Sequence, residues 1–247
     1  MRMICIIYRF HGWRQHTICG NKTRRLPSFS DRRNARRWRQ LFFALLCCLP
    51  AALASARTPE QTAAPFDYYV LALSWSPAYC AWNPADHSQC GQRRFAFVLH
   101  GLWPQYQAGG YPRQCANTRP SRPVIERALA FMPSATLIGH EWRKHGTCSG
   151  LAPGAYFIAA ERAFSAVSIP PLFQADPIPQ HLTAQDITRA FTDANPGLNS
   201  RRIALKCRGP ELEEVRLCLD RALKPTDCGR GIKSHCRRGP IQIRPLR

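Results

Sequence analysis

The positions of the cysteines constrain the fold of this chain more than any other feature of its sequence. Four of the twelve cysteines lie in the first 56 residues, and the other eight lie between residues 80 and 236. An even number of cysteines in an exported chain indicates disulfides, here up to four. A zinc site is the competing interpretation, but no two of the eight have the C-x2-C spacing that is common among zinc ligands. The eight are Cys80, Cys90, Cys115, Cys148, Cys207, Cys218, Cys228 and Cys236.

Residues 1–56 are predicted to be a leader with a signal peptide and not part of the fold. A basic run over Arg32–Arg39 precedes the almost wholly apolar stretch Leu41–Leu53, and the small-residue sequence ALASA ends at Ala56. Basic, then apolar, then small residues is the order of a secretory signal peptide. We expect cleavage after Ala56, with Ala54 as the second choice.

This leader predicts export without a membrane anchor. The apolar stretch is too short for a comfortable transmembrane helix. A lipoprotein anchor at Cys47 or Cys48 is disfavoured because Leu46 occupies a position where a small residue is expected. Together with the cysteines, the leader predicts an oxidising compartment, the bacterial periplasm in preference to full secretion.

The remainder of the chain is moderately basic. The whole chain carries a formal net charge of +20, from 35 Lys and Arg against 15 Asp and Glu. Residues 1–56 hold 11 of the basic residues and one acidic residue, which leaves 24 basic and 14 acidic residues in 57–247. This excess suits a polyanionic partner without identifying it.

Residues 57–247 are predicted to form a single α+β domain, in which several helices pack on a central, mainly antiparallel sheet stapled by disulfides. Apolar or alternating segments predict strands at 67–75, 94–100, 202–207 and 214–220. Helical patterns and start signals predict helices at 121–132, 140–146, 154–167 and 182–197, with Ser121 and Thr183 as caps. Gly101, Pro104 and the pair Gly109–Gly110 predict a loop directly after His100.

The segment HEWRKHGTC, residues 140–148, concentrates ionisable groups on one part of a helix. With His140 at 0° on a helical wheel, Lys144 falls near 40°, Glu141 near 100° and His145 near 140°, at about 100° per residue. Trp142 points elsewhere and is free to anchor the helix in the core. Glu141 precedes His145 by one turn, which predicts that the two pair and that the protonated histidine is favoured.

By itself this segment allows a metal site, a solvated polar face or a proton-transfer site. Zincins place their histidines at i and i+4 with a glutamate between them. Here the spacing is i and i+5, and Lys144 would repel a cation, so a metal is disfavoured. For the helix alone, the solvated polar face is the simplest interpretation.

A second motif, FVLHGLWPQ at residues 97–105, favours proton transfer. His100 ends an apolar strand, where a rigid scaffold can present catalytic side chains on the following loop. Trp103, expected to be exposed, would offer a stacking surface for a base. Two imidazoles on separate rigid elements can act together as base and acid. In RNA cleavage one takes the 2′ proton and the other protonates the leaving 5′ oxygen, without a metal.

The motifs H-G-L-W-P and H-E-W-x-K-H-G-T-C, in this order and about forty residues apart, resemble the two active-site segments of the ribonuclease T2 family. The likeness extends over most of Phe66–Cys228, including LALSWSPAYC and ANPGL, and leaves out the leader and the basic tail. It implies a metal-independent endoribonuclease similar to the bacterial periplasmic members, which cleaves single-stranded RNA through the 2′-OH to 2′,3′-cyclic phosphate ends. It implies no cofactor, and DNA is not a substrate.

The resemblance also implies roles for individual residues. His145 corresponds to the general base and His100 to the general acid. Glu141 and Lys144 correspond to groups that polarise the phosphate and stabilise the pentacovalent transition state, and His140 corresponds to a phosphate-binding histidine.

Three further residues correspond to the base-binding region. Trp103 matches an aromatic of the first base pocket, and Tyr111 stands where the family often has a second. Gln105 replaces the acidic residue that some members use to select the base. We therefore expect broad base specificity.

The family's disulfides imply four pairs here: Cys80–Cys90, Cys115–Cys148, Cys207–Cys236 and Cys218–Cys228. The pair Cys115–Cys148 would connect the segment after the first motif to the end of the catalytic helix. By the chain-entropy estimate it would contribute roughly 3–4 kcal/mol.

Two other functions remain as alternatives. One is a secreted RNA- or polyanion-binding module of the same fold without catalysis, and the other is a metallopeptidase. The basic tail supports RNA binding or solubility equally, through Arg230, Lys233, Arg237, Arg238, Arg244 and Arg247. We expect RNA as the partner and a monomeric protein.

Overall fold

A computed structural model of the chain describes residues 65–174 and 181–246. The predicted leader and its two cleavage sites lie outside the described residues. Within the described ranges, no helix combines the length and the apolar character needed to cross a membrane.

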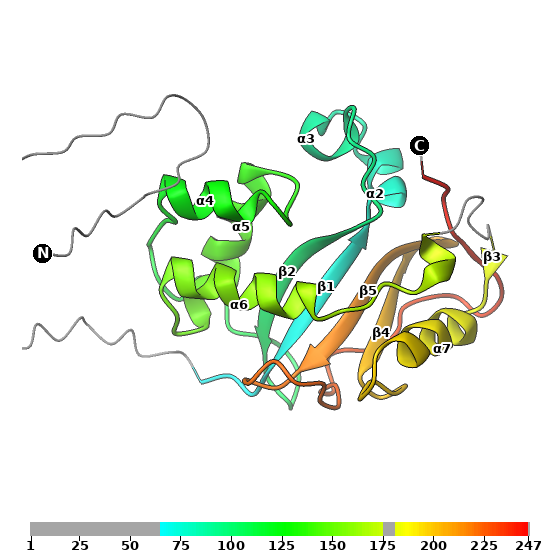
Figure 1. Cartoon of the computed structure of the whole chain (residues 1–247). Helices are drawn as coiled ribbons and strands as arrows, with labels where there is room; N and C mark the ends of the chain where they lie inside the picture. Colours follow the sequence, from blue (N-terminus) through cyan, green and yellow to red (C-terminus); the bar gives the residue numbers. More distant parts are fainter. Residues whose placement is uncertain (1–64, 175–180, 247) are drawn as a thin grey trace, which may run out of the picture. The chain divides into compact units, whose positions relative to one another are not determined.

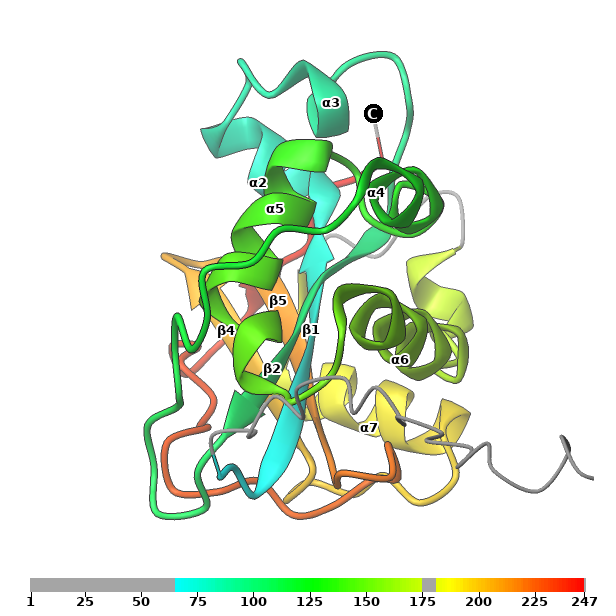
Figure 2. The same cartoon turned by 90° about the vertical axis from the view of Figure 1, so that its left-hand side faces the viewer.

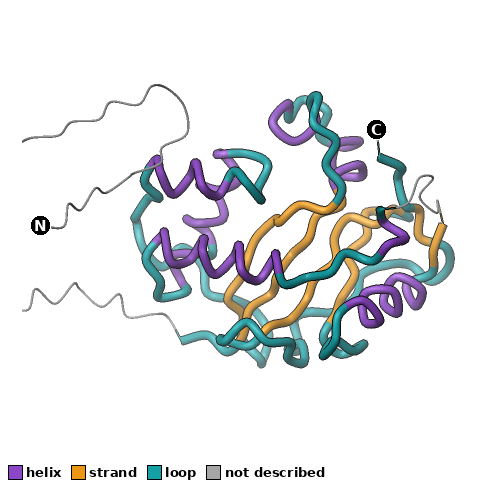
Figure 3. The backbone as a smooth tube through the Cα atoms, viewed as in Figure 1, coloured by secondary structure: helices purple, strands orange, loops and turns teal. Residues whose placement is uncertain are grey.

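Four long strands form the body of one sheet (Figures 1 and 3). The central strand β1 (Tyr68–Trp75) pairs antiparallel with β2 (Phe97–Gln105) on one side and with β5 (Glu211–Leu219) on the other. Strand β4 (Ile203–Arg208) is antiparallel to β5. Two short strands complete the sheet: β6 (Ile241–Gln242) runs parallel to β5, and β3 (His181–Leu182) pairs with β6. The predicted α+β fold with a mainly antiparallel sheet is confirmed.

The predicted helices are present, and two short ones are added. The predicted four are α4 (Arg122–Ala128), α5 (Ala135–Lys144), α6 (Pro153–Ser165) and α7 (Ala184–Ala194). The sequence does not predict α2 (Ser76–Trp82) or α3 (His87–Cys90). Pro77 ends strand β1 as expected, but it also stands in the first turn of α2, where proline is well tolerated. Two single 3-10 turns, η1 (Gly146–Cys148) and η2 (Pro171–Phe173), follow α5 and α6.

The two predicted helix caps differ. Thr183 forms a capping box at the start of α7, since its hydroxyl accepts from the Asp186 backbone N–H and the Asp186 carboxylate accepts from the Thr183 backbone N–H. Ser121 occupies the cap position of α4, but its side chain makes no capping hydrogen bond. The prediction is confirmed for Thr183 alone.

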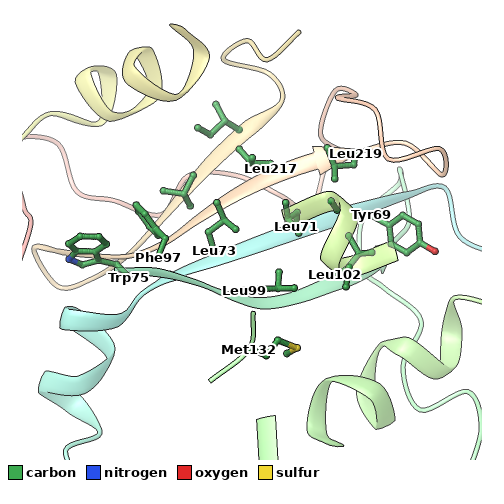
Figure 4. Packing of buried hydrophobic residues seen from close by; sticks show 14 of the residues in the cluster. Tyr69, Leu71, Leu73, Trp75, Phe97, Leu99, Leu102, Met132, Leu217 and Leu219 are labelled. Carbon is green, nitrogen blue, oxygen red and sulfur yellow. The ribbon is translucent and has the colours of Figure 1, made fainter. Parts of the chain in front are cut away.

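Alternate side chains of β1 enter two different apolar clusters, because successive residues of a strand point to opposite faces. Tyr69, Leu71, Leu73 and Trp75 belong to the main core, which includes residues of α6 and α7 (Figure 4). Tyr68, Val70 and Ala72, which point to the opposite face, form a smaller cluster with Trp103 and Cys218. The helices α6 and α7 lie on the main-core side of the sheet (Figure 2). The opposite face of the sheet carries the smaller cluster that contains Trp103.

A β-bulge in β2 is centred on His100. Ala72 pairs with Gly101 and Leu73 pairs with Leu99, so His100 is the extra residue between them. A bulge redirects side chains, and here it brings His100 and Trp103 together although strict alternation would point residues three apart to opposite faces. The predicted loop after His100 is wrong, because the strand continues to Gln105.

Four disulfides join the pairs that the resemblance implies: Cys80–Cys90, Cys115–Cys148, Cys207–Cys236 and Cys218–Cys228. The bond between Cys115 and Cys148 connects the segment after β2 to the turn η1, which directly follows α5. It therefore ties together the two segments that carry the histidine motifs.

Candidate active site

His100 lies between two buried carboxylates. Its Nδ1 is 2.7 Å from Oε1 of Glu214, a residue of β5, and its Nε2 is 3.6 Å from Oε1 of Glu141, a residue of α5. The side chains of Glu214 and Glu141 are only 3% and 2% exposed. Desolvation acts to lower the pKa of His100, but the hydrogen bond to Glu214 and the charges of both carboxylates outweigh it, so the pKa is raised.

The same contacts act on Glu214 in return. Burial acts to raise the pKa of Glu214, but the hydrogen bond from His100, its charge and the guanidinium of Arg216 lower that pKa to about 2. Nη2 of Arg216 is 2.7 Å from Oε2 of Glu214. The Glu214 carboxylate is therefore ionised at neutral pH.

Trp103 connects the two motifs and is not the exposed platform that the sequence predicts. Its side chain is 9% exposed, and its Nε1–H donates to Oε2 of Glu141 at 2.6 Å. The ring meets His100 edge to face at 5.1 Å and stacks on His145 at 5.3 Å. Any Cβ atom at Gly101 would overlap both Glu141 and Trp103, which explains the glycine beside His100.

His145 lies in the opposite electrostatic environment. It ends α5 with non-helical dihedrals and is 4% exposed. Its Nδ1 has no hydrogen-bond partner among the described residues. Desolvation, followed by the positive charges of Lys144 and His100, lowers the pKa of His145 to about 3. The predicted pairing of Glu141 with His145 is wrong: Glu141 pairs with His100 and Trp103, and the neutral form of His145 is favoured.

The remaining predicted residues of α5 lie at the edge of this site. His140 is exposed, and desolvation with the charges of Lys144 and Arg143 lowers its pKa. Lys144 is half-buried. Trp142 is fully buried in the main core, as the helical wheel predicts. The four ionisable groups therefore divide into a buried pair that contacts Trp103 and an outer pair that faces solvent.

The two other predicted base-pocket residues differ in access. Tyr111 is 37% exposed, and its ring lies 5.3 Å from the ring of His145. Gln105 is 4% exposed at the end of β2, opposite Tyr68. Of the two, only Tyr111 has a surface open to a base.

Three polar residues of β4 and β5 complete the site, and the sequence interpretation missed them. Lys206 lies 3.9 Å from Glu214, and Arg216 lies 5.2 Å above the ring of Trp103. Together with His100, the residues Lys206 and Glu214 line a cavity of about 140 Å³. The sequence signal for Glu214 and Arg216 is the alternation E-V-R-L-C over residues 214–218, which points these two side chains to the same face of the strand.

No group of three or more metal-ligating side chains that could hold an ion occurs in the part of the chain that the structure describes. The chemistry available from the described side chains is proton transfer by the histidines and charge stabilisation by the surrounding cations.

The comparisons with known proteins agree with this arrangement. A model of the ribonuclease T2 family matches residues 66–228, which include both histidine motifs and the strand of Glu214. This chain belongs to the ribonuclease T2 family. The match ends at Cys228, so the basic tail lies outside it.

Two bacterial relatives share part of the chain. A ribonuclease of Aeromonas hydrophila is 52% identical over 98 residues, which cover 40% of this chain and 45% of the relative. A probable ribonuclease of Haemophilus influenzae is 29% identical over 185 residues, 68% of this chain and 63% of the relative. The chain thus spans about half to two thirds of the length of these relatives.

Solved structures have the same fold. RNase NT, in a complex with 5′-AMP, matches with a TM-score of 0.58 and 25% identity over 73% of this chain and 99% of that one. An RNase-related protein from Calystegia sepium matches with a TM-score of 0.60 and 24% identity, over 73% and 98% of the two chains.

Proposed function

We propose that this protein is a metal-independent endoribonuclease that cleaves single-stranded RNA by attack of the 2′-hydroxyl on the adjacent phosphate. One observation carries the proposal: His100 and His145 both contact Trp103, and their pKa values are displaced in opposite directions. Two titratable groups whose surroundings separate their pKa values are suited to act as an acid and a base at the same pH.

His145 is the base. Its low pKa keeps the ring neutral, so a nitrogen lone pair is available to the 2′-hydroxyl. Nε2 is the acting nitrogen, since Nδ1 is buried in the domain. As the 2′ proton passes to Nε2, the O2′–P bond forms. The negative phosphate brought close to the ring raises its basicity at the moment of transfer.

His100 is the acid. Its raised pKa keeps the ring protonated, and Glu214 holds Nδ1 so that Nε2 points toward Glu141. Nε2 donates its proton to O5′ as the P–O5′ bond breaks. The products are a 2′,3′-cyclic phosphate and a 5′-hydroxyl, and the proton count of the enzyme is unchanged over the step.

Charge on phosphorus is stabilised from α5. Lys144 supplies positive charge, and His140, whose lowered pKa favours the neutral ring, supplies an imidazole N–H that can donate to the phosphate. The contribution of Lys144 is largest when negative charge gathers in the pentacovalent transition state. Glu141 accepts from the Trp103 Nε1–H and faces Nε2 of His100, so its carboxylate orients the proposed acid beside the phosphate. DNA lacks the 2′ nucleophile and is bound but not cleaved.

Base specificity is proposed to be broad. Trp103 is buried between the two histidines and Gln105 is buried behind them, so neither has a free edge for base recognition. Tyr111 keeps an exposed ring face beside His145, and stacking on such a face tolerates every base.

We also propose that the mature protein begins after Ala56 and is exported to the periplasm, where the four disulfides form. The N-terminal sequence of protein recovered from a periplasmic fraction tests this. Cleavage elsewhere than after Ala54 or Ala56, or retention in the cytoplasm, would contradict it.

The experiment that tests the enzymatic proposal is a product analysis. Mature protein is incubated in excess EDTA with single-stranded RNA and, separately, with DNA of the same sequence. We expect fragments with 2′,3′-cyclic phosphate ends from RNA and intact DNA. Intact RNA that is nevertheless tightly bound would identify a non-catalytic RNA-binding module, and cleavage that EDTA abolishes would identify a metal-dependent enzyme.

A further inference from the structure

The segment Gly229–Arg238, here called the strap, is a strongly basic run of the described domain. Its sequence GRGIKSHCRR holds four Arg and Lys residues and a histidine, and no acidic residue follows Asp227 to the end of the chain. The strap lies beyond the residues that match the family, so the match does not account for it.

Disulfides hold the strap at both ends. Cys228, directly before it, is bonded to Cys218 of β5, and Cys236, near its end, is bonded to Cys207 of β4. Backbone hydrogen bonds add to this: the Arg230 N–H donates to the Gln107 carbonyl at 3.0 Å, and the His235 N–H donates to the Leu205 carbonyl at 2.8 Å. The strap is therefore a fixed part of the domain and not a free tail.

The strap crosses the catalytic face of the sheet. Ile232, at its middle, packs against the small cluster that contains Trp103 (Figure 2 shows this segment on the side of the sheet away from α6 and α7). At its start, a Cβ atom on Gly231 would lie 3.2 Å from the Cα of Gly109, in the turn that leads to Tyr111. The strap thus begins beside the segment that carries Tyr111 over His145.

Its far end pairs with strand β4, which carries a residue of the cavity beside His100. His235 is bridged to Lys206 of β4, and Lys206 lines the same cavity as His100. The strap therefore extends along the catalytic face from the side of the proposed base to the side of the proposed acid.

The charges along the strap are available to an external anion. Arg230, Lys233 and His235 are exposed, and no carboxylate lies within 4.0 Å of any of them in residues 65–174 and 181–246. In contrast, Arg216 on the same face is paired with Glu214. Ordered cations in a row beside a catalytic centre are how proteins follow a nucleic-acid backbone.

We propose that the strap binds RNA phosphates outside the cleaved linkage and so makes the protein prefer long single strands over short ones. The contacts come chiefly from Arg230 and Lys233, and they are electrostatic and independent of base identity. This inference rests on the proposed ribonuclease function, because the substrate must lie between Tyr111 and Lys206 for its backbone to meet the strap.

The test compares two double variants of the mature protein on two substrates. The strap variant is Arg230→Gln with Lys233→Gln. The control is Arg162→Gln with Arg189→Gln, which removes the same charge from exposed positions on α6 and α7, on the opposite side of the sheet. The substrates are a dinucleoside monophosphate, which contains only the cleaved phosphate, and a long single-stranded RNA.

We expect the strap variant to lose roughly tenfold in kcat/KM on long RNA at moderate salt. The slope of log kcat/KM against log salt should become shallower by about 1.4, from about 0.7 for each lost phosphate contact. Cleavage of the dinucleoside by the strap variant and both activities of the control should match the parent protein.

A binding measurement separates this inference from the proposed function. A fluorescent 2′-O-methyl RNA oligonucleotide cannot be cleaved through its 2′ oxygen, so its affinity is measurable whether or not the protein is catalytic. Weaker, less salt-sensitive binding by the strap variant alone supports the inference. Equal loss on the dinucleoside, or binding equal to that of the control, overturns the inference and leaves the ribonuclease proposal intact. Failure of the parent protein to cleave either RNA overturns the ribonuclease proposal and the substrate preference derived from it.

Discussion

His100 and His145 contact the same indole ring from two different regions, a strand and a helix end, and they have opposite electrostatic surroundings. On strand β2, His100 lies between the carboxylates of Glu141 from α5 and Glu214 from β5, which raise its pKa. The helix region buries His145 beside Lys144, and no carboxylate of the described residues pairs with it, so desolvation and positive charge lower its pKa to about 3. The pKa values of two identical side chains are thus displaced in opposite directions, because desolvation is outweighed by negative charge at one and reinforced by positive charge at the other. The predictions below test this difference.

The largest expected effect follows from removal of either ring. His100→Ala and His145→Ala should each lower kcat by roughly 10²–10⁴, the usual contribution of a positioned acid or base. The double variant should be about as slow as the slower single variant, because the two groups act in one step. Steady-state kinetics on single-stranded RNA measures this, with circular dichroism to show that the fold is kept. A single variant that retains more than a tenth of the parent kcat would remove that residue from its role.

The disulfide between Cys115 and Cys148 joins the two regions, so its removal should separate them. Cys115→Ser with Cys148→Ser should reduce the free energy of unfolding by roughly 3–4 kcal/mol by the loop-entropy estimate. It should also lower kcat, because the histidines are no longer held at a fixed separation. Denaturation under non-reducing conditions and kinetics well below the unfolding transition measure the two effects.

The matched control is Cys80→Ser with Cys90→Ser, which opens the disulfide between α2 and α3. This pair should lose stability with a smaller change in kcat. Equal losses of kcat in the two variants would contradict a positioning role for the Cys115–Cys148 bond.

Lys144 should matter in the transition state more than in substrate binding. Lys144→Ala should lower kcat by about 10², the order observed when one stabilising donor is removed from a developing charge. The KM should change much less, because the ground-state phosphate carries less negative charge on phosphorus than the pentacovalent state. A rise in KM with unchanged kcat would make Lys144 a substrate-binding residue only.

The smallest expected effect on rate, and the sharpest test of the comparison, comes from Glu214→Gln. An uncharged amide retains a hydrogen bond to His100 but removes the charge that raises its pKa. We expect a loss of about tenfold in kcat, in line with a hydrogen bond between charged groups. The test is the dependence of kcat/KM on pH.

In the parent protein, activity should fall at both ends of the pH range. His145 must be neutral, so activity is lost as pH falls through its pKa of about 3. His100 must be protonated, and its raised pKa means that activity is lost only as pH rises above the ordinary histidine range. Glu214→Gln should move the alkaline limb to lower pH and leave the acid limb in place. Glu213→Gln is the control, because Glu213 is a neighbouring carboxylate that forms a salt bridge with Lys206. It should move neither the acid limb nor the alkaline limb of the pH profile. An alkaline limb that does not move in Glu214→Gln would contradict the role of Glu214.

Much of the fold could be predicted from the sequence because its signals are local. The hydrophobic pattern of 67–75, the helix signals before α4 and α7 and the parity of the cysteines each depend on nearby residues. The small helices α2 and α3 could not be predicted, since Pro77 is compatible both with the end of a strand and with the start of a helix. The bulge at His100 could not be predicted either, because it is a property of the pairing between β1 and β2.

What the sequence by itself determined is the set of candidate side chains: two histidines in two motifs, with Glu141 and Lys144 on the same helix as His140. Only the tertiary structure decided how these groups differ. Glu141 turns to His100 and not to its helical neighbour His145, and Trp103 is buried between the histidines instead of exposed. Glu214, 114 residues from His100 in the chain, accepts the hydrogen bond that helps to raise the pKa of His100. The reason is physical: a pKa depends on every charge and on the solvent within a few ångströms. That neighbourhood is assembled from β2, α5 and the pair β4 and β5, three regions that are distant in sequence.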